Sequence, residues 1–350
     1  MEKIHGGDIY SYNREMIDFS ANISPLGMPQ KIKEHVADTI LSAEKYPDVN
    51  YKRLRDALAK IENVDCDRII CGNGAAELIF NIVLALTPKK VLLVSPTFAE
   101  YEKAVDTLDC EKLFYPLKEK NNFEINEDFL DFIDESLDMV FICQPNNPVG
   151  NCTDPELMIK IAEKCRENNV LAVFDECFVN FIDNGNIYSM LKYTDVYKNI
   201  FILKAFTKMF AVPGLRIGYG ICSDDVLINR MYTVRQPWNI SSVAEEAVLA
   251  ACSIYSETVE KTVKYINNEK KYLISEFKRL GIEYFRPMAN YIFFKEKEGL
   301  KDKLADKGIL IRACGNYRGL DGRFYRIAVK NHNDNLKLIS ALEEYIWQKQ

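Results

Sequence analysis

Two lysines and one arginine lie close together between residues 199 and 220. The apolar run Ile200 to Leu203 predicts a buried strand, and Lys208 follows it beside a threonine and eight residues before Arg216. A lysine is rarely buried without a function, and burial together with a neighbouring cation lowers the pKa of its amine. The spacing therefore favours an amine that binds an aldehyde as a Schiff base, next to an anion site. The alternative is a solvated lysine in an ordinary loop.

Two further motifs follow predicted strands earlier in the chain. The segment GNGAAE, residues 72–77, opens an apolar helix and leaves free backbone N–H groups where a phosphate could bind. It is not a dinucleotide fingerprint, because Glu77 stands in the place of the last glycine. Phe98 lies just past another strand, where its ring is able to stack on a flat ligand. The alternatives are a tight turn and an ordinary core phenylalanine.

An amide and a carboxylate also follow predicted strands. Asn147 lies between prolines in QPNNPVG, residues 144–150, so its amide is held in a fixed direction that suits a hydrogen bond to a ligand. Asp175 follows the run 170–174, at the sheet edge where open α/β folds bind ligands, although it could instead cap a helix. We expect the phosphate loop, aromatic ring, amide, carboxylate and lysine to meet at one edge of a parallel sheet.

The overall composition argues against nucleic acid and membranes as partners. Of the 350 residues, 48% are hydrophobic, and the formal net charge is −6 with the charges scattered along the chain. The first residues lack an apolar signal core, and no run approaches the roughly 18 apolar residues of a membrane span. We therefore expect a soluble cytoplasmic protein that binds neither nucleic acid nor membranes, and whose anionic ligands are held by local arginines.

The cysteines and histidines predict neither disulfides nor a metal site. The ten cysteines include no C-x-x-C pair, and several lie in apolar runs, which is typical of reduced core residues. The three histidines, His5, His35 and His332, are far apart in the sequence. We expect no bound metal.

Apolar runs that alternate with helical patterns predict an α/β fold. Strands that read as continuous apolar runs between helices imply a mostly parallel sheet covered by helices on both faces. The expected strands are residues 68–71, 91–95, 139–143, 170–174, 200–203 and 217–221, and the expected helices before and among them are 30–42, 51–61, 75–86 and 155–168.

We divide the chain into three parts. Residues 1–46 form an N-terminal arm and first helix, which pack with the small domain or a dimer partner, and residues 47–241 form the large domain. Residues 242–350 form a linking helix, too long to lack a bend, and a small α+β domain. We expect strands at 282–285, 291–295, 310–313 and 325–329 and helices at 300–306 and 333–347 in this small domain. The cleft between the domains is the expected site.

These motifs, in this order, resemble the fold-type I aminotransferase superfamily of classes I and II along nearly the whole chain. The resemblance implies a large domain that binds pyridoxal 5′-phosphate and a homodimer with shared active sites. It implies catalytic roles for Lys208, as the Schiff-base lysine, and for Asp175, which keeps the pyridine nitrogen protonated. The other cofactor contacts that it implies are Gly74, Ala75 and Ala76 of the phosphate loop, the stacking ring of Phe98, Asn147, the phosphate ligands Thr207 and Arg216, and Tyr46 donated to the neighbouring subunit.

Within the superfamily, three stretches favour a resemblance to L-threonine-O-3-phosphate decarboxylase of cobalamin side-chain synthesis. They are the arm with His5 and DFSANISPLG at residues 18–27, Phe178 where aminotransferases usually carry a tyrosine, and the arginine-rich run 311–326. The resemblance implies decarboxylation to an amino-alcohol phosphate. The substrate contacts that it implies are His5 on the phosphate, Arg326 on the carboxylate, and Asn22, Arg312 and Arg323.

The alternative family is histidinol-phosphate aminotransferase of histidine biosynthesis, which transfers an amino group between glutamate and imidazole-acetol phosphate. The same cofactor residues would serve it. Serine phosphate in place of threonine phosphate also stays open, because one methyl group changes binding by only about 1–3 kcal/mol and Ala205, Gly315 and Arg318 depart from the expected pattern. A non-catalytic, cofactor-bound regulator would need a DNA-binding segment, which the sequence lacks.

Overall fold

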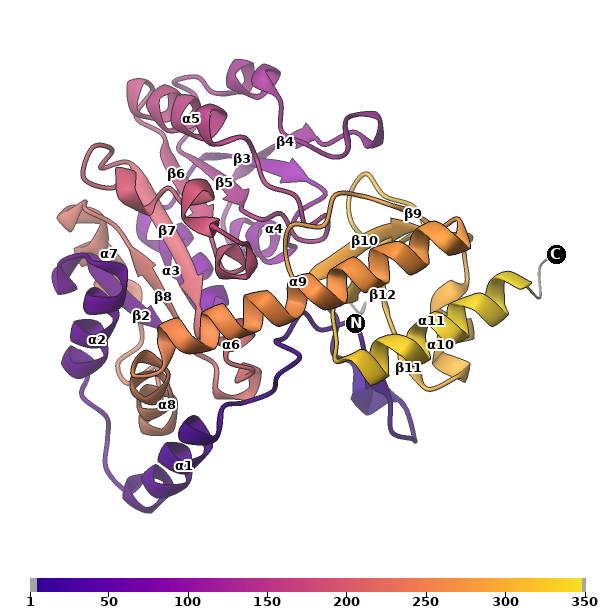
Figure 1. The fold of residues 1–350 in the computed structure, drawn as a ribbon. Coiled ribbons are helices and arrows are strands. Elements are labelled where there is room, and N and C mark those ends of the chain that lie inside the picture. The colour runs from indigo at the N-terminus through magenta and orange to yellow at the C-terminus, as the bar shows by residue number, and fades with distance from the viewer. Residues whose placement is uncertain (1–4, 348–350) are drawn as a thin grey trace.

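A computed structural model describes residues 5–347 of the chain (Figure 1). Its larger part is a seven-stranded sheet with the strand order β2-β8-β7-β6-β5-β3-β4. Only β8 runs antiparallel to its neighbours, so the sheet is mostly parallel and the predicted α/β fold is confirmed. The strands are β2 (Ile69–Gly72), β3 (Lys90–Ser95), β4 (Glu111–Pro116), β5 (Met139–Cys143), β6 (Leu171–Asp175), β7 (Ile200–Ala205) and β8 (Gly218–Ile221).

Helices cover both faces of this sheet. Successive residues of each strand point to opposite sides, so the apolar residues of one strand pack against helices on both faces. One face packs against α3 (Ala75–Leu86), α4 (Glu100–Val105) and α7 (Asp225–Val234). The other packs against α2 (Lys52–Glu62), α5 (Pro155–Glu167) and α8 (Ser242–Cys252). Local sequence fixes several helix starts; Asp154, for example, accepts hydrogen bonds from two N–H groups of the first turn of α5, and Pro155 opens the helix.

The C-terminal part is built on a second sheet, antiparallel, with the order β12-β13-β10-β9. The long helix α9 (Tyr255–Leu280) runs from the large sheet to this smaller one (Figure 1). A break between α8 and α9, at residues 253–254, provides the bend that the sequence predicts. The remaining elements are β9 (Glu283–Tyr284), β10 (Tyr291–Lys295), α10 (Leu300–Asp306), β11 (Ile309–Leu310), β12 (Arg312–Ala313), β13 (Phe324–Ala328) and α11 (His332–Trp347).

The N-terminal arm connects the two sheets. Its strand β1 (Ile17–Asp18) pairs in parallel with β11, and the backbone N–H of Ala328 donates to the carbonyl of Phe19 at 2.7 Å. Further along, the N–H of Ser24 donates to the carbonyl of Lys208 at 2.9 Å, before α1 (Gln30–Thr39) begins. The arm therefore runs from the small sheet to the end of β7. Within residues 5–347, none of the helices combines the length and the hydrophobicity that a membrane crossing needs.

Candidate active site

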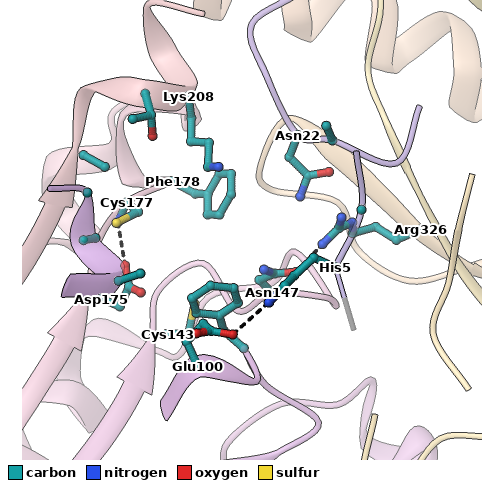
Figure 2. A pocket seen from close by; sticks show the side chains of 18 of the residues that line it. His5, Asn22, Glu100, Cys143, Asn147, Asp175, Cys177, Phe178, Lys208 and Arg326 are labelled. Carbon is teal, nitrogen blue, oxygen red and sulfur yellow. Dashed lines mark hydrogen bonds and ion pairs between the residues drawn. The ribbon is translucent and has the colours of Figure 1, made fainter. Parts of the chain in front are cut away.

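A cavity of about 390 Å³ lies at the carboxyl ends of β5, β6 and β7, with the N-terminal arm on its other side (Figure 2). It brings together most of the side chains that the sequence analysis singled out, from segments more than 300 residues apart. These are His5, Asn22, Gly74, Ala75, Ala76, Phe98, Asn147, Asp175, Thr207, Lys208, Arg216 and Arg326.

Three of the expected residues lie outside this cavity. Tyr46 is 80% exposed and its ring packs on Trp238, with the centroids 4.6 Å apart. Arg312 is buried in a smaller neighbouring cavity of about 60 Å³, where it donates to the carbonyl of Ala313 at 2.7 Å. Arg323 is half-exposed and forms an ion pair with Asp321 at 2.7 Å. The substrate and cofactor roles of these three residues remain predictions.

Lys208 lies on the short helix α6 (Phe206–Met209), directly after β7. It is partly exposed to the cavity and otherwise surrounded by protein. Burial lowers the pKa of its amine, and the cations Arg216 and Arg326 lower it further. A lowered pKa gives the neutral amine that a Schiff-base nucleophile requires.

The other lysine of this segment, Lys204, does not line the cavity. It is buried, and its Nζ forms an ion pair with Oε2 of Glu62 at 2.6 Å, while the hydroxyl of Tyr219 donates to Oε1 of the same carboxylate. The pKa of Lys204 lies above its ordinary value: burial lowers it, but the carboxylates of Glu62 and Glu176 outweigh that effect. Lys204 is therefore a permanently charged link between α2 and the sheet.

The N-terminus of α3 has the geometry of an anion-binding cradle. Gly74 precedes the helix at φ 83°, and no side chain within the described residues caps the helix. The guanidinium of Arg216 lies against Gly74, since a Cβ there would be 2.7 Å from Arg216 Nη2. The buried Thr207 also lines the cavity. Backbone N–H groups, a hydroxyl and a guanidinium together suit a phosphate group.

The carboxylate of Asp175 is held firmly at the end of β6. It is only 5% exposed, and it accepts hydrogen bonds from the hydroxyl of Tyr101 at 2.6 Å and from the backbone N–H of Cys177 at 3.0 Å. In Figure 2, Asp175 and Lys208 lie on one side of the cavity, and Asn22 and Arg326 lie on the other. A carboxylate and an amine on one side of the cavity therefore face an amide and a guanidinium on the other.

Arg326 lies on β13 and is fixed by two acceptors. It donates to the side-chain oxygen of Asn147 and, at 2.6 Å, to the carbonyl of Ser20 in the arm. Asn22 is also buried, and its Oδ1 has no hydrogen-bond partner among the described residues. Both side chains line the cavity, so a ligand there meets a guanidinium and an unpaired amide oxygen.

His5 reaches the cavity from the arm and contacts α4. Its Nε2 is 2.7 Å from Oε1 of Glu100, and its ring centroid is 6.0 Å from that of Phe98. The hydrogen bond with His5, together with Lys103, lowers the pKa of Glu100 to about 2. Glu100 therefore stays ionised throughout the neutral range and holds the histidine beside the cavity.

Several residues of the cavity were missed by the sequence analysis. Glu100 lines the cavity, and Tyr101 contacts two residues of its lining, Phe98 and Asp175. They follow Phe98 by two and three residues, about one helical turn. That spacing was the available signal. Cys143 and Cys177 also line the cavity, although their sequence context indicated only core residues. Within residues 5–347, no group of His, Cys, Asp and Glu side chains is arranged to bind a metal ion.

Comparison with known proteins identifies the family. Residues 14–342 match the model of the family described as aminotransferase class I and II. The chain belongs to this family. It is 39% identical to a protein of Caldanaerobacter subterraneus subsp. tengcongensis provisionally named threonine-phosphate decarboxylase, over 97% of this chain and 92% of that protein.

Two further relatives cover almost the whole chain. The threonine-phosphate decarboxylase of Salmonella typhimurium is 34% identical, over 95% of this chain and 92% of that protein. The crystal structure of histidinol-phosphate aminotransferase from Clostridium acetobutylicum superposes with a TM-score of 0.88 at 32% identity, covering 94% of this chain and 99% of that chain. The resemblance to both families that the sequence predicts is thus confirmed.

Pyridoxal 5′-phosphate is the cofactor of this family. The cavity fits it, because the phosphate cradle of α3 and Arg216 lies beside a partly buried lysine with a lowered pKa and a buried carboxylate. A phosphate, an aldehyde and a protonated pyridine nitrogen need these three groups.

Proposed function

We propose that the protein decarboxylates L-threonine O-3-phosphate to the amino-alcohol phosphate and carbon dioxide. The observation that carries this proposal is the position of His5, which the arm brings into the same cavity as Arg326. The cradle at α3 is the site expected for the cofactor's phosphate, so a substrate with a phosphate and a carboxylate needs two further anion sites. His5 and Arg326 supply them. The relatives named threonine-phosphate decarboxylase support the same conclusion.

The chain's own residues divide the reaction between them. When bound, pyridoxal phosphate supplies an electron sink for the pair of electrons released at Cα. Arg326, held by Asn147 and the arm, binds the substrate carboxylate with its planar fork. Lys208 then delivers a proton to Cα, in the place of the lost carbon dioxide. Its lowered pKa makes the protonated amine a better proton donor than an ordinary lysine.

Phe178 supports decarboxylation rather than amino transfer. It lines the cavity, and its ring packs on the edge of Tyr291 with the centroids 5.2 Å apart. Phenylalanine has no hydroxyl to donate to the cofactor, and the hydroxyl of Tyr291 donates elsewhere, to the carbonyl of Asn146 at 2.8 Å. Residue 178, where aminotransferases usually carry a tyrosine hydroxyl, is therefore apolar in this protein.

The experiment is a single reaction without any keto acid. Purified protein with pyridoxal phosphate and L-threonine phosphate is followed for carbon dioxide and for an aminopropanol phosphate. We expect release of both in equal amounts, with serine phosphate as a second substrate to test the contribution of one methyl group. Products that retain the carboxylate would contradict the proposal.

The second candidate is histidinol-phosphate aminotransferase, which the structural likeness at a TM-score of 0.88 favours. The same cradle, lysine and carboxylate would serve it. Transfer of an amino group from glutamate to imidazole-acetol phosphate, without carbon dioxide release from threonine phosphate, would establish this function instead.

We also propose a cytoplasmic homodimer in which Tyr46 reaches the cofactor phosphate of the neighbouring subunit. Its support is the exposure of large apolar side chains close to Tyr46 in the sequence, Ile40 and Leu41, and of Trp238, on which the ring of Tyr46 packs. Mixing Tyr46→Ala with Lys208→Ala tests the sharing, because one site of each mixed dimer then has both residues. Activity that recovers on mixing supports it, and sedimentation as a monomer contradicts it.

The division of the chain at residues 46 and 241, and the cobalamin pathway, also remain predictions.

A further inference from the structure

Tyr101 is a fully buried residue of α4 that contacts two walls of the cavity from behind. Its hydroxyl donates to Oδ2 of Asp175 at 2.6 Å. Its ring meets Phe98 edge to face, with the centroids 5.6 Å apart and the planes at 81°. On its other side the ring stacks on Phe141, with the centroids 4.9 Å apart and the planes at 12°. The two ring contacts fix where the hydroxyl lies.

The phenol of Tyr101 is a permanent hydrogen-bond donor. Burial raises its pKa well above the usual value, and the neighbouring carboxylate of Asp175 raises it further. The hydroxyl therefore keeps its proton throughout the neutral range. An ionised carboxylate in a buried site is stabilised by each such donor, and a donor lost from a buried charged group is costly.

The two oxygens of Asp175 are held by different parts of the fold. Oδ2 accepts from Tyr101 on α4, and Oδ1 accepts from the backbone N–H of Cys177 after β6. With one donor on each oxygen, the carboxylate cannot rotate about its Cβ–Cγ bond without breaking a hydrogen bond. Without Tyr101, Asp175 would keep the backbone N–H of Cys177 on Oδ1 and lose the hydroxyl donor on Oδ2.

We propose that Tyr101 is a positioning residue of the cofactor site, which fixes the plane of the Asp175 carboxylate toward the pyridine nitrogen. Through its edge contact the same ring sets the position of Phe98, so the carboxylate and the stacking ring keep a fixed relation. The inference rests on the cofactor of the proposed function but not on its substrate. Nothing in the reaction passes through Tyr101 itself.

The first test compares two tyrosine-to-phenylalanine variants. Tyr101→Phe removes one oxygen and keeps the ring contacts. The matched control is Tyr115→Phe, since Tyr115 is also buried and donates to an aspartate, Asp128. It lies on β4, and neither Asp128 nor the rings that it contacts line the cavity. Thermal unfolding of both variants checks that the fold is retained.

We expect Tyr101→Phe to bind pyridoxal phosphate about tenfold more weakly or worse, as for a lost hydrogen bond to a charged group. The affinity of Tyr115→Phe should equal that of the wild type. The pH dependence of the visible absorbance of the loaded protein should also shift in Tyr101→Phe alone. Cofactor affinity needs no substrate, so this result holds even where threonine phosphate is not decarboxylated.

A double-mutant cycle separates positioning from packing. Asp175→Asn removes the charged acceptor, so adding Tyr101→Phe to it should weaken cofactor binding by less than about twofold. Equal losses in the two backgrounds would mean that Tyr101 acts only through packing, and would overturn the proposal. So would a Tyr101→Phe variant whose cofactor affinity and absorbance profile match those of Tyr115→Phe.

Discussion

Gly218, the first residue of β8, gives the sharpest test of the phosphate cradle. A Cβ at this position would lie 2.4 Å from the backbone nitrogen of Ala75 and 2.7 Å from the carbonyl carbon of Gly74. Ordinary contact begins near 3.4 Å, so alanine at residue 218 would require a backbone shift of about 1 Å. Gly218 is paired with Gly72 on β2 and with Ala205 on β7, so the strand is held on both sides. The cradle must move instead.

The expected loss follows from the hydrogen bonds that the cradle would make. Two N–H groups displaced by about 1 Å would each lose a bond to a charged phosphate, at about 1.5–3 kcal/mol apiece. Gly218→Ala should therefore bind pyridoxal phosphate at least about a hundredfold more weakly. Overpacking should also lower the free energy of unfolding by about 1–3 kcal/mol.

The assay is a titration of cofactor-free protein with pyridoxal phosphate, followed by absorbance. The matched control is Gly214→Ala, four residues earlier in the same segment, where an added Cβ meets no atom within 4 Å. Its cofactor affinity should be unchanged. If Gly218→Ala binds the cofactor as tightly as Gly214→Ala does, the N-terminus of α3 is not the phosphate site.

Three other predictions concern charged side chains. Lys208→Ala should abolish carbon dioxide release and the visible absorbance band of the bound cofactor, whereas Lys204→Ala should lower thermal stability with the band retained. The pKa of Glu100 is lowered from 4.5 to about 2 in the folded protein, so its contribution to stability is present above pH 4.5 and lost as the pH falls toward 2; acid unfolding of Glu100→Gln should show a smaller pH dependence over this window. Burial lowers the pKa of Lys270 from 10.5 to about 8 in the folded protein, so the stability of the wild type relative to Lys270→Met should rise between pH 8 and pH 10.5, as measured by urea unfolding.

The parts of the site that could be predicted from sequence are those that follow parallel strands. Asp175 and Lys208 directly follow apolar runs, and the carboxyl ends of parallel strands meet at one edge, so their proximity follows from the topology. The sequence favours Lys208 as the Schiff-base lysine but leaves open whether Lys204 also matters. The strand points Lys204 away from the cavity toward Glu62, and only the turn into α6 brings Lys208 back to it.

The C-terminal arginines show where sequence reasoning ends. Arg312 and Arg326 are paired residues of β12 and β13, yet Arg326 lines the main cavity while Arg312 lies in the smaller one, against the ring of Tyr317. The spacing of the arginines along the sequence does not reveal that Arg312, and not Arg326, lies against the ring of Tyr317. Arg323 lies in a turn, where the nearby Asp321 is its acceptor.

The strand β4 was also missed, for a different reason. Its sequence EKLFYP is mostly polar or half-buried because the strand lies at the edge of the sheet. The continuous apolar run that marks the central strands is absent from an edge strand, which is buried on fewer sides. Pairing with β3 alone determines its place.

The pairing of β1 with β11 has a consequence for the order in which the protein becomes functional. It joins Ile17 to Ile309, and Arg326 donates to the carbonyl of Ser20, so one wall of the cavity combines segments from both ends of the chain. A chain that emerges from the ribosome can close the seven-stranded sheet once residue 221 has appeared. The arm has no strand to pair with until about ninety residues later. The wall of the cavity built from the large sheet can therefore exist before the wall that the arm and β13 form during synthesis.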